Sequence, residues 1–216
     1  MKKKQIGQEL ILSAVLLAAF VLWTELVRTV DLQPIGPRGS VVGFAKINGF
    51  VHSLTGTNML LYTITDWLGL VAVAFVAGFG ILGLWQWIKR KSILKVDYSI
   101  LILGLFYITI FAVYLLFEGV VINYRPVLIN GRLETSYPSS TTLLVFCVMP
   151  TAVIQLKSRM NKSILRTCLM SAMYAFTVFM IGGRLISGVH WITDIIGSIL
   201  ISAGLVVLYR AIVRIK

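Results

Sequence analysis

Three side chains with complementary chemistry lie close together near the end of the sequence: Arg184, His190 and Asp194. His190 and Asp194 are four residues apart, so on a helix they share one face. The carboxylate can then hold one nitrogen of the imidazole ring and leave the other free to attack an electrophile or to bind a ligand. Since charged groups beside lipid are costly, the segment predicts either a functional site or a buried ion pair that stabilises helix packing.

Two other segments contain groups that suit a phosphate. Arg125 precedes Pro126, which ends a predicted helix, and its planar guanidinium can bind phosphate oxygens or, alternatively, extend to lipid headgroups. The hydroxyl residues Ser139, Ser140 and Thr141 precede an apolar run, which indicates the start of a helix. The free N–H groups of a helix start can bind an anion, although simple helix capping gives the same pattern.

Together these groups meet the requirements of phosphoryl transfer. Arg125 and Arg184 supply positive charge for the phosphoryl oxygens, and the helix start supplies backbone donors. His190 supplies a nucleophile, which Asp194 orients. The sequence contains no spacing typical of a metal site, so we expect no metal and no other cofactor.

The composition predicts a polytopic membrane protein. Of 216 residues, 58% are hydrophobic and 13% are charged, and the mean hydropathy of +0.90 is too high for an ordinary soluble domain. A membrane-spanning helix needs about 20 apolar residues. Six segments qualify, so we expect an all-α bundle of six transmembrane helices, forming one domain over residues 1–216. The segments lie near Leu10–Val27, Leu60–Ile88, Tyr98–Ile122, Thr142–Leu156, Cys168–Ile181 and Trp191–Tyr209.

The basic residues predict the orientation of this bundle in a plasma membrane. The formal net charge is +12, and 14 of the 20 lysine and arginine residues lie at one set of helix ends. That set is expected to be cytoplasmic, so both termini lie inside and the charge predicts no nucleic-acid partner. The segments around Arg125, Ser139 and His190 then all emerge at the outer, extracytoplasmic face.

The loop from Asp31 to Asn58 contains apolar residues at roughly helical spacing. This pattern predicts a short amphipathic helix that lies on the outer membrane surface. Two acids near the outer helix ends, Glu25 and Asp66, are each expected to pair with Arg28 or Arg38.

The motifs resemble those of the type 2 phosphatidic acid phosphatase (PAP2) superfamily. Its third motif is Ser-Arg, five residues, His, three residues, Asp; it matches here at Arg184, His190 and Asp194, with Gly183 in place of the serine. The six-helix layout of the resemblance covers nearly the whole chain. It implies that His190 attacks phosphorus to form a phosphohistidine, while Asp194 and Arg184 complete the catalytic set.

The other two motifs match in part. The first, Lys, six residues, Arg-Pro, matches at Arg125-Pro126, with Glu118 at the position of the lysine. The second, Pro-Ser-Gly-His, matches at Pro138-Ser139, with serine and threonine in place of the last two residues. Arg132, in the same predicted outer loop, is expected to replace the missing positive charge. The resemblance thus implies a phosphate site formed by Arg125, Arg132, Ser139, Ser140 and Thr141.

Thr141 stands where the family has a histidine that protonates the leaving oxygen. A threonine hydroxyl cannot act as an acid near neutral pH, and general acid catalysis is typically worth about 10²–10⁴-fold. A phosphate leaving group needs little protonation, whereas an alkoxide needs much. We therefore expect a phosphatase that prefers a lipid diphosphate, such as a polyprenyl diphosphate, to a lipid monophosphate.

Two alternatives share the same residues. The altered motifs also fit a catalytically weak protein that binds phospholipid or polyprenyl phosphate for transport, sensing or assembly. A phosphotransferase would pass the phosphoryl group from His190 to a lipid or sugar instead of water. The oligomeric state cannot be read from the sequence, and no paired broken helices or repeated halves indicate a transporter.

Overall fold

The computed structural model describes residues 2–215 and contains, over that range, helices, loops and isolated β-bridges but no β-strand. Six helices within it are long and apolar enough to cross a membrane, which confirms the predicted all-α membrane fold. The prediction of one domain extends to Met1 and Lys216, which lie outside the described residues. The six helices are α1 (Lys2–Thr29), α3 (Met59–Arg90), α4 (Tyr98–Gly119), α5 (Ser140–Arg159), α6 (Ile164–Ile186) and α7 (Ile192–Ile215).

Several helices are longer than the apolar segments that predicted them. The predicted segment Cys168–Ile181 corresponds to α6, which runs from Ile164 to Ile186. Arg184 lies in its last turn and is 1% exposed, so it faces protein and not lipid. An apolar run therefore underestimates a helix whose polar residues are buried inside the bundle.

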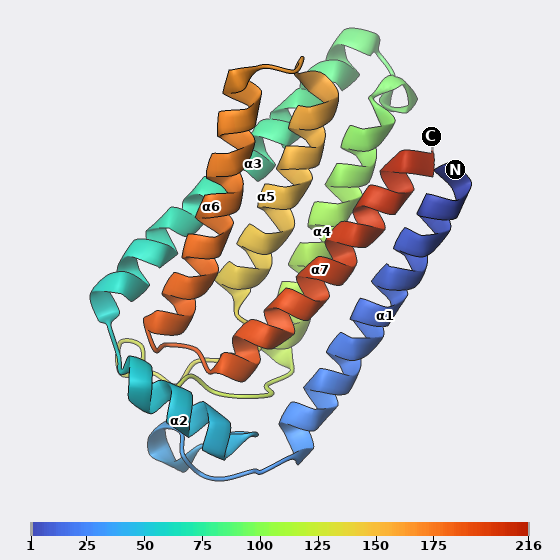
Figure 1. Ribbon diagram of the computed structural model, residues 1–216. Helices are drawn as coiled ribbons and strands as arrows, with labels where there is room; N and C mark the ends of the chain where they lie inside the picture. The colour runs from blue at the N-terminus through green and yellow to red at the C-terminus, as the bar shows by residue number, and fades with distance from the viewer. Residues whose placement is uncertain (1, 216) are drawn as a thin grey trace.

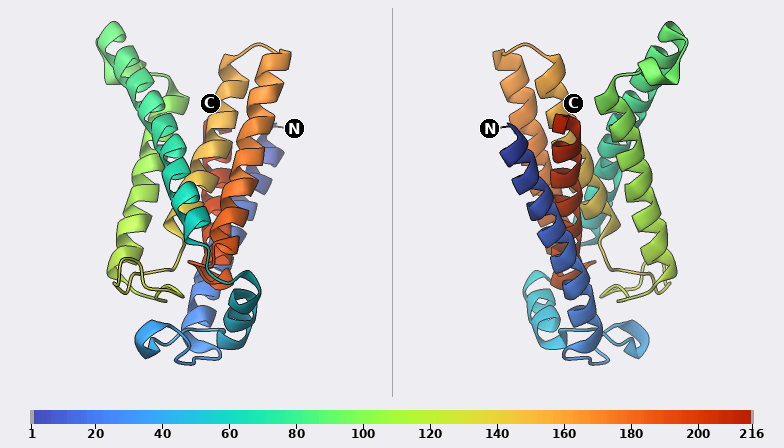
Figure 2. Two further views of the ribbon diagram at one scale, coloured as in Figure 1. Left: turned by 90° about the vertical axis from the view of Figure 1, so that its left-hand side faces the viewer. Right: turned by 90° about the vertical axis from the view of Figure 1, so that its right-hand side faces the viewer.

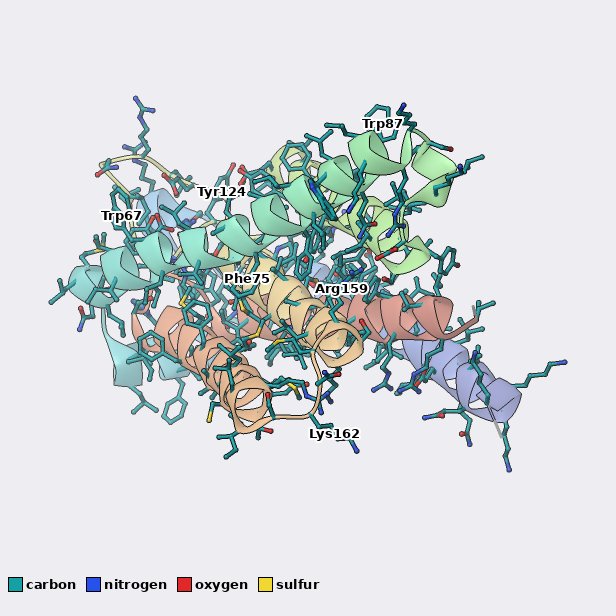
Figure 3. All side chains as sticks on the ribbon, turned by 90° about the horizontal axis from the view of Figure 1, so that it is seen from above. Trp67, Phe75, Trp87, Tyr124, Arg159 and Lys162 are labelled. Atoms are coloured by element: carbon teal, nitrogen blue, oxygen red, sulfur yellow. The ribbon has the colours of Figure 1, made fainter. Side chains whose placement is uncertain are left out.

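The helices form two unequal groups (Figures 1 and 2). Helix α7 packs along α1 and α5, and α6 packs on α5. Helices α3 and α4 lie together on one side of this group, and α3 leans away from it toward the end where the termini lie. In a view along the bundle, Phe75 of α3 points toward α5, whereas Trp67 lies on the outer side of α3 (Figure 3). Trp67 is 69% exposed, as expected for a lipid-facing side chain.

All the segments with candidate site residues lie at one end of the bundle, which we call the loop end (Figure 1). It is formed by residues 30–58, 120–139 and 187–191. The termini, with the turns between α3 and α4 and between α5 and α6, lie at the opposite end. The three predicted outer segments thus share one end, and their extracytoplasmic location stays a prediction from the charge distribution.

The loop end contains the helix predicted in the first loop, α2 (Ala45–Thr55). Its exposed residues Ile47, Phe50 and Leu54 recur at helical spacing and form an apolar face. On the opposite side, the amide of buried Asn48 contacts Thr193, in the first turn of α7. Helix α2 is therefore fixed against α7, and its position on a membrane surface stays a prediction.

Tyr137 anchors the loop between α4 and α5 over α7. The ring is buried, and its hydroxyl shares a hydrogen bond of 2.7 Å with the hydroxyl of Thr24 in α1. A Cβ atom at Gly197 of α7 would lie 2.6 Å from this ring, so only glycine leaves room for it. This contact fixes the position of Ser136 and Ser139, which flank the anchored segment.

Candidate active site

Two guanidinium groups and one imidazole meet at the loop end. Nε2 of His190 lies 3.3 Å from Nη1 of Arg125 and 3.2 Å from Nη2 of Arg184. The three residues come from three separate segments, and each is at most 8% exposed. The structure therefore brings together the central residues of the predicted first and third motifs.

His190 lies in the turn before α7, not on the helix itself. Helix α7 begins at Ile192, so the expectation that His190 and Asp194 share a helix face is wrong. The turn depends on Gly188, which has a φ of +64° and whose Cβ would lie 1.7 Å from the carbonyl oxygen of Gly56. Asp194, the third residue of α7, accepts the backbone N–H of Trp191 at 2.9 Å and thereby caps the helix start.

Ser136 lies between the imidazole and the carboxylate. Nδ1 of His190 and Oδ2 of Asp194 are 3.8 Å apart, which is too long for a hydrogen bond. The Ser136 hydroxyl donates to Oδ2 of Asp194 and lies 3.1 Å from Nδ1, and its carbonyl oxygen is also 3.1 Å from Nδ1. Asn123 donates a further hydrogen bond of 3.3 Å to the other oxygen of Asp194. The carboxylate thus orients the ring through a residue that the sequence analysis missed.

These contacts determine the protonation of His190. The carbonyl oxygen of Ser136 can only accept, so Nδ1 bears the proton and Nε2 has a free lone pair. Burial lowers the pKa of His190 well below its usual range, and the charges of Arg125 and Arg184 lower it further. The imidazole is therefore neutral at neutral pH, with Nε2 available as a nucleophile.

Four acids lie near the site: Asp66, Glu118, Glu134 and Asp194. Two of them, Glu134 and Asp66, neutralise the two guanidinium groups. Nε of Arg125 lies 3.2 Å from the carboxylate of Glu134, and Nη1 of Arg184 lies 3.5 Å from that of Asp66. Tyr62 of α3 covers both groups, with its ring centroid 5.9 Å from Arg125 and 4.8 Å from Arg184.

The predicted acid pairings are confirmed for one residue and wrong for another. Glu25 does pair with Arg28, at 3.1 Å. Asp66 instead pairs with Arg184, because α3 and α6 pack side by side at the loop end.

The hydroxyl residues Ser139, Ser140 and Thr141 lie near two separate openings, a small cavity and a larger cleft. A small cavity of about 20 Å³ is lined by Ser140 together with His190 and Arg125. A larger cleft of about 550 Å³, mostly apolar, lies between α3, α4 and α5 and is lined by Ser140 and Thr141. Ser139 is buried at the start of α5, and its hydroxyl has no hydrogen-bond partner within residues 2–215. The cavity and the cleft therefore adjoin at Ser140, with Tyr114 and Leu143 also lining both.

Besides Ser139, two residues of the predicted phosphate site do not line the small cavity beside His190. Thr141 faces α3, where its methyl group lies 3.6 Å from the Cβ position of Gly69. Arg132 is exposed and is bonded to Ile129 through the backbone only, so its side chain does not line the small cavity. Among the described residues, no three His, Cys, Asp or Glu side chains lie close enough together to hold a metal ion.

Two comparisons with known proteins found a match. A family model described as "PAP2 superfamily" matches residues 70–216. The fold is similar to a solved structure described as the first transmembrane PAP2 type phosphatidylglycerolphosphate phosphatase from Bacillus subtilis, with a TM-score of 0.62 and 16% sequence identity. The alignment covers 92% of this chain and 93% of that one, and at this identity it shows the shared fold. A comparison with curated proteins found no match.

Proposed function

Since this chain belongs to the PAP2 superfamily, we propose that it is a membrane phosphatase that removes a phosphoryl group from a lipid through a phosphohistidine at His190. The observation that supports this most directly is the position of Nε2. It is an unprotonated nitrogen between two guanidinium groups, at the loop end of a membrane bundle. A buried structural histidine would have little use for two cations around its free lone pair.

The reaction begins with the exchange of one set of contacts for another. Arg125 and Arg184 leave Nε2 and bind the phosphoryl oxygens, with which they form stronger, charge-assisted hydrogen bonds. Nε2 then attacks phosphorus, and the proton on Nδ1 stays on the ring, held by the carbonyl oxygen of Ser136. The backbone N–H group of Ser140, at the start of α5, adds a donor for the charge that develops in the transition state, whereas the N–H of Ser139 donates to the carbonyl oxygen of Asp194.

The substrate we propose is a lipid diphosphate in preference to a monophosphate. Thr141 lines the apolar cleft and has no acidic proton, so it cannot protonate an alkoxide that leaves from phosphorus. A polyprenyl diphosphate releases a phosphate, which needs little protonation. The cleft adjoins the small cavity at Ser140, and its apolar lining suits the hydrocarbon chain of such a lipid.

Trapping the covalent intermediate tests this function. The purified protein in detergent is incubated with farnesyl diphosphate labelled in its terminal phosphate, quenched in alkali, and assayed for label that is stable to alkali and released by acid. We expect label in the unaltered chain and none in His190→Ala. If substrate binds equally to both proteins and neither takes label, the chain is a lipid-phosphate binding protein.

A phosphotransferase would form the same intermediate but would discharge it differently. Adding an acceptor lipid to the labelled protein separates the two reactions. Hydrolysis releases inorganic phosphate whether or not acceptor is present, whereas phosphotransfer moves the label into the lipid.

A further inference from the structure

The proposed reaction leaves one proton without a donor. Breaking the bond between phosphorus and a lipid oxygen is helped by a proton that reaches this oxygen as it leaves, typically by about 10²–10⁴-fold. Thr141 has only a hydroxyl, and this residue lines the apolar cleft and not the cavity that contains His190. Any replacement acid must therefore lie elsewhere around the cavity.

Three of the four acids near the site are already engaged. Asp66 and Glu134 pair with Arg184 and Arg125. Asp194 is completely buried and accepts three hydrogen bonds, from Ser136, Trp191 and Asn123. None of these three carboxyl groups lines the small cavity.

Glu118 is the fourth acid, and its surroundings differ. It lies in the last turn of α4 and lines the same small cavity as His190 and Arg125. No lysine, arginine or histidine within residues 2–215 forms an ion pair with it. Its neighbours are hydroxyl groups: Thr135 donates a hydrogen bond of 3.1 Å, and Tyr114 lies one turn earlier on α4. Of the four acids, it is the one that lines this cavity and has no cationic partner among residues 2–215.

The same short segment positions both groups that face the cavity. Thr135 holds the Glu118 carboxyl, and the next residue, Ser136, holds the imidazole of His190. Between them, the cavity of about 20 Å³ has room for roughly one water molecule. A molecule in that space lies between His190 and Glu118, which both line the cavity.

We infer that Glu118 is the catalytic acid of this chain, and this inference rests on the proposed phosphatase function. As Nε2 of His190 bonds to phosphorus, the bond from phosphorus to the leaving oxygen breaks and the Glu118 proton moves to that oxygen. This step releases the lipid alcohol from a lipid monophosphate, or the lipid monophosphate from a lipid diphosphate. In the second step, the Glu118 carboxylate takes a proton from water as the water oxygen bonds to phosphorus. The bond to Nε2 then breaks, inorganic phosphate leaves, and His190 and Glu118 return to their starting states.

Comparing two leaving groups tests the inference. Turnover of phosphatidic acid, whose leaving group is an alkoxide, is measured beside that of farnesyl diphosphate, whose leaving group is a phosphate. We expect Glu118→Gln to lower kcat on phosphatidic acid by roughly 100-fold. On farnesyl diphosphate the loss is expected to be far smaller, so that the preference for the diphosphate increases. Glu118→Asp, which retains a proton on a shorter side chain, is expected to restore part of the lost activity.

The matched control is Glu25→Gln, which alters an exposed acid that pairs with Arg28 outside the cavity and should change neither activity. Phosphohistidine formation from farnesyl diphosphate shows that Glu118→Gln is folded. Equal losses on both substrates, or gains on both from removal of a repulsive charge, would reject the acid role while leaving the phosphatase function intact. If the unaltered chain turns over neither substrate and takes no label, both proposals are wrong.

Discussion

Two buried carboxylates at opposite ends of α7 have opposite surroundings. At the end near the termini, Glu9 of α1 lies 3.0 Å from Nε of Arg210 and also pairs with Arg214. At the loop end, Asp194 is held by neutral donors, while two arginines lie nearby and contact His190 instead.

This difference distinguishes a carboxylate that stabilises helix packing from one that positions a reacting group. A carboxylate that pairs directly with cations ties two helices together and leaves no charge available to a ligand. Asp194 is held by neutral donors and pairs with neither arginine. Glu134 and Asp66 contact one nitrogen of each guanidinium group, and another nitrogen of each lies at Nε2 of His190, where a phosphate can replace the ring. Four predictions test this contrast, beginning with the largest expected effect.

The nucleophile itself should have the largest effect. His190→Gln retains much of the ring's volume but removes Nε2, so phosphoryl transfer should fall by roughly 10⁴-fold or more. The measurement is kcat/KM on farnesyl diphosphate. Residual activity within about ten-fold of the unaltered chain would mean that water attacks phosphorus directly.

The two carboxylates should then respond in opposite ways. Asp194→Asn should lower the rate of phosphohistidine formation by about 10²–10⁴-fold, because the ring loses its orientation. Glu9→Gln should leave that rate unchanged but lower the free energy of unfolding by about 1–3 kcal/mol, a modest loss because both arginines are about 40% exposed. Label trapping and thermal unfolding in detergent measure the two effects, and a catalytic loss in Glu9→Gln would remove the distinction.

A pH profile tests the role of the two arginines that contact His190. Burial, Arg125 and Arg184 keep the pKa of His190 well below its usual range, so its protonation should limit the rate only at pH values well under 6.5. Arg125→Gln removes one of these charges and should move the acidic limb of kcat/KM to higher pH. Ser136→Ala should lower the rate by about ten-fold without that move, because it changes the orientation of the ring and not the charges around it.

Arg132 is expected to have the smallest effect. Its side chain is exposed and outside the cavity, so it can attract the substrate only from a distance. Arg132→Ala should raise KM several-fold at low ionic strength, with kcat unchanged. An unaltered KM would remove Arg132 from the phosphate site.

The sequence predicted the membrane fold and the end of the bundle where Arg125, Arg184 and His190 meet. Both follow from regular patterns: apolar runs of spanning length, and basic residues gathered at alternate helix ends. The path of the loop between α4 and α5 cannot be predicted from apolar runs or from the distribution of basic residues. Ser136 reaches His190 only because residues 123–136 fold back on themselves, with an isolated bridge between Tyr124 and Thr135.

The positions of other residues differed from their predictions because the spacing of residues along one helix does not show which other helices pack against it. The interval between His190 and Asp194 fits a helix equally well whether or not the helix includes both, and Gly188 starts the turn that excludes His190. Thr141 directs its side chain to α3, and Asp66 reaches Arg184, because of how α3 packs against α5 and α6. These contacts depend on tertiary packing.

The residues ahead of the family-matched region contribute directly to the active-site scaffold. The match begins at residue 70, yet Trp23 donates a hydrogen bond of 3.0 Å to the carbonyl oxygen of Thr193, and Tyr62 covers both guanidinium groups. A chimera that joined residues 70–216 to the corresponding N-terminal segment of another family member would therefore separate interlocking partners. Such an exchange would succeed only if the donor segment supplied equivalents of Trp23, Asn48 and Tyr62.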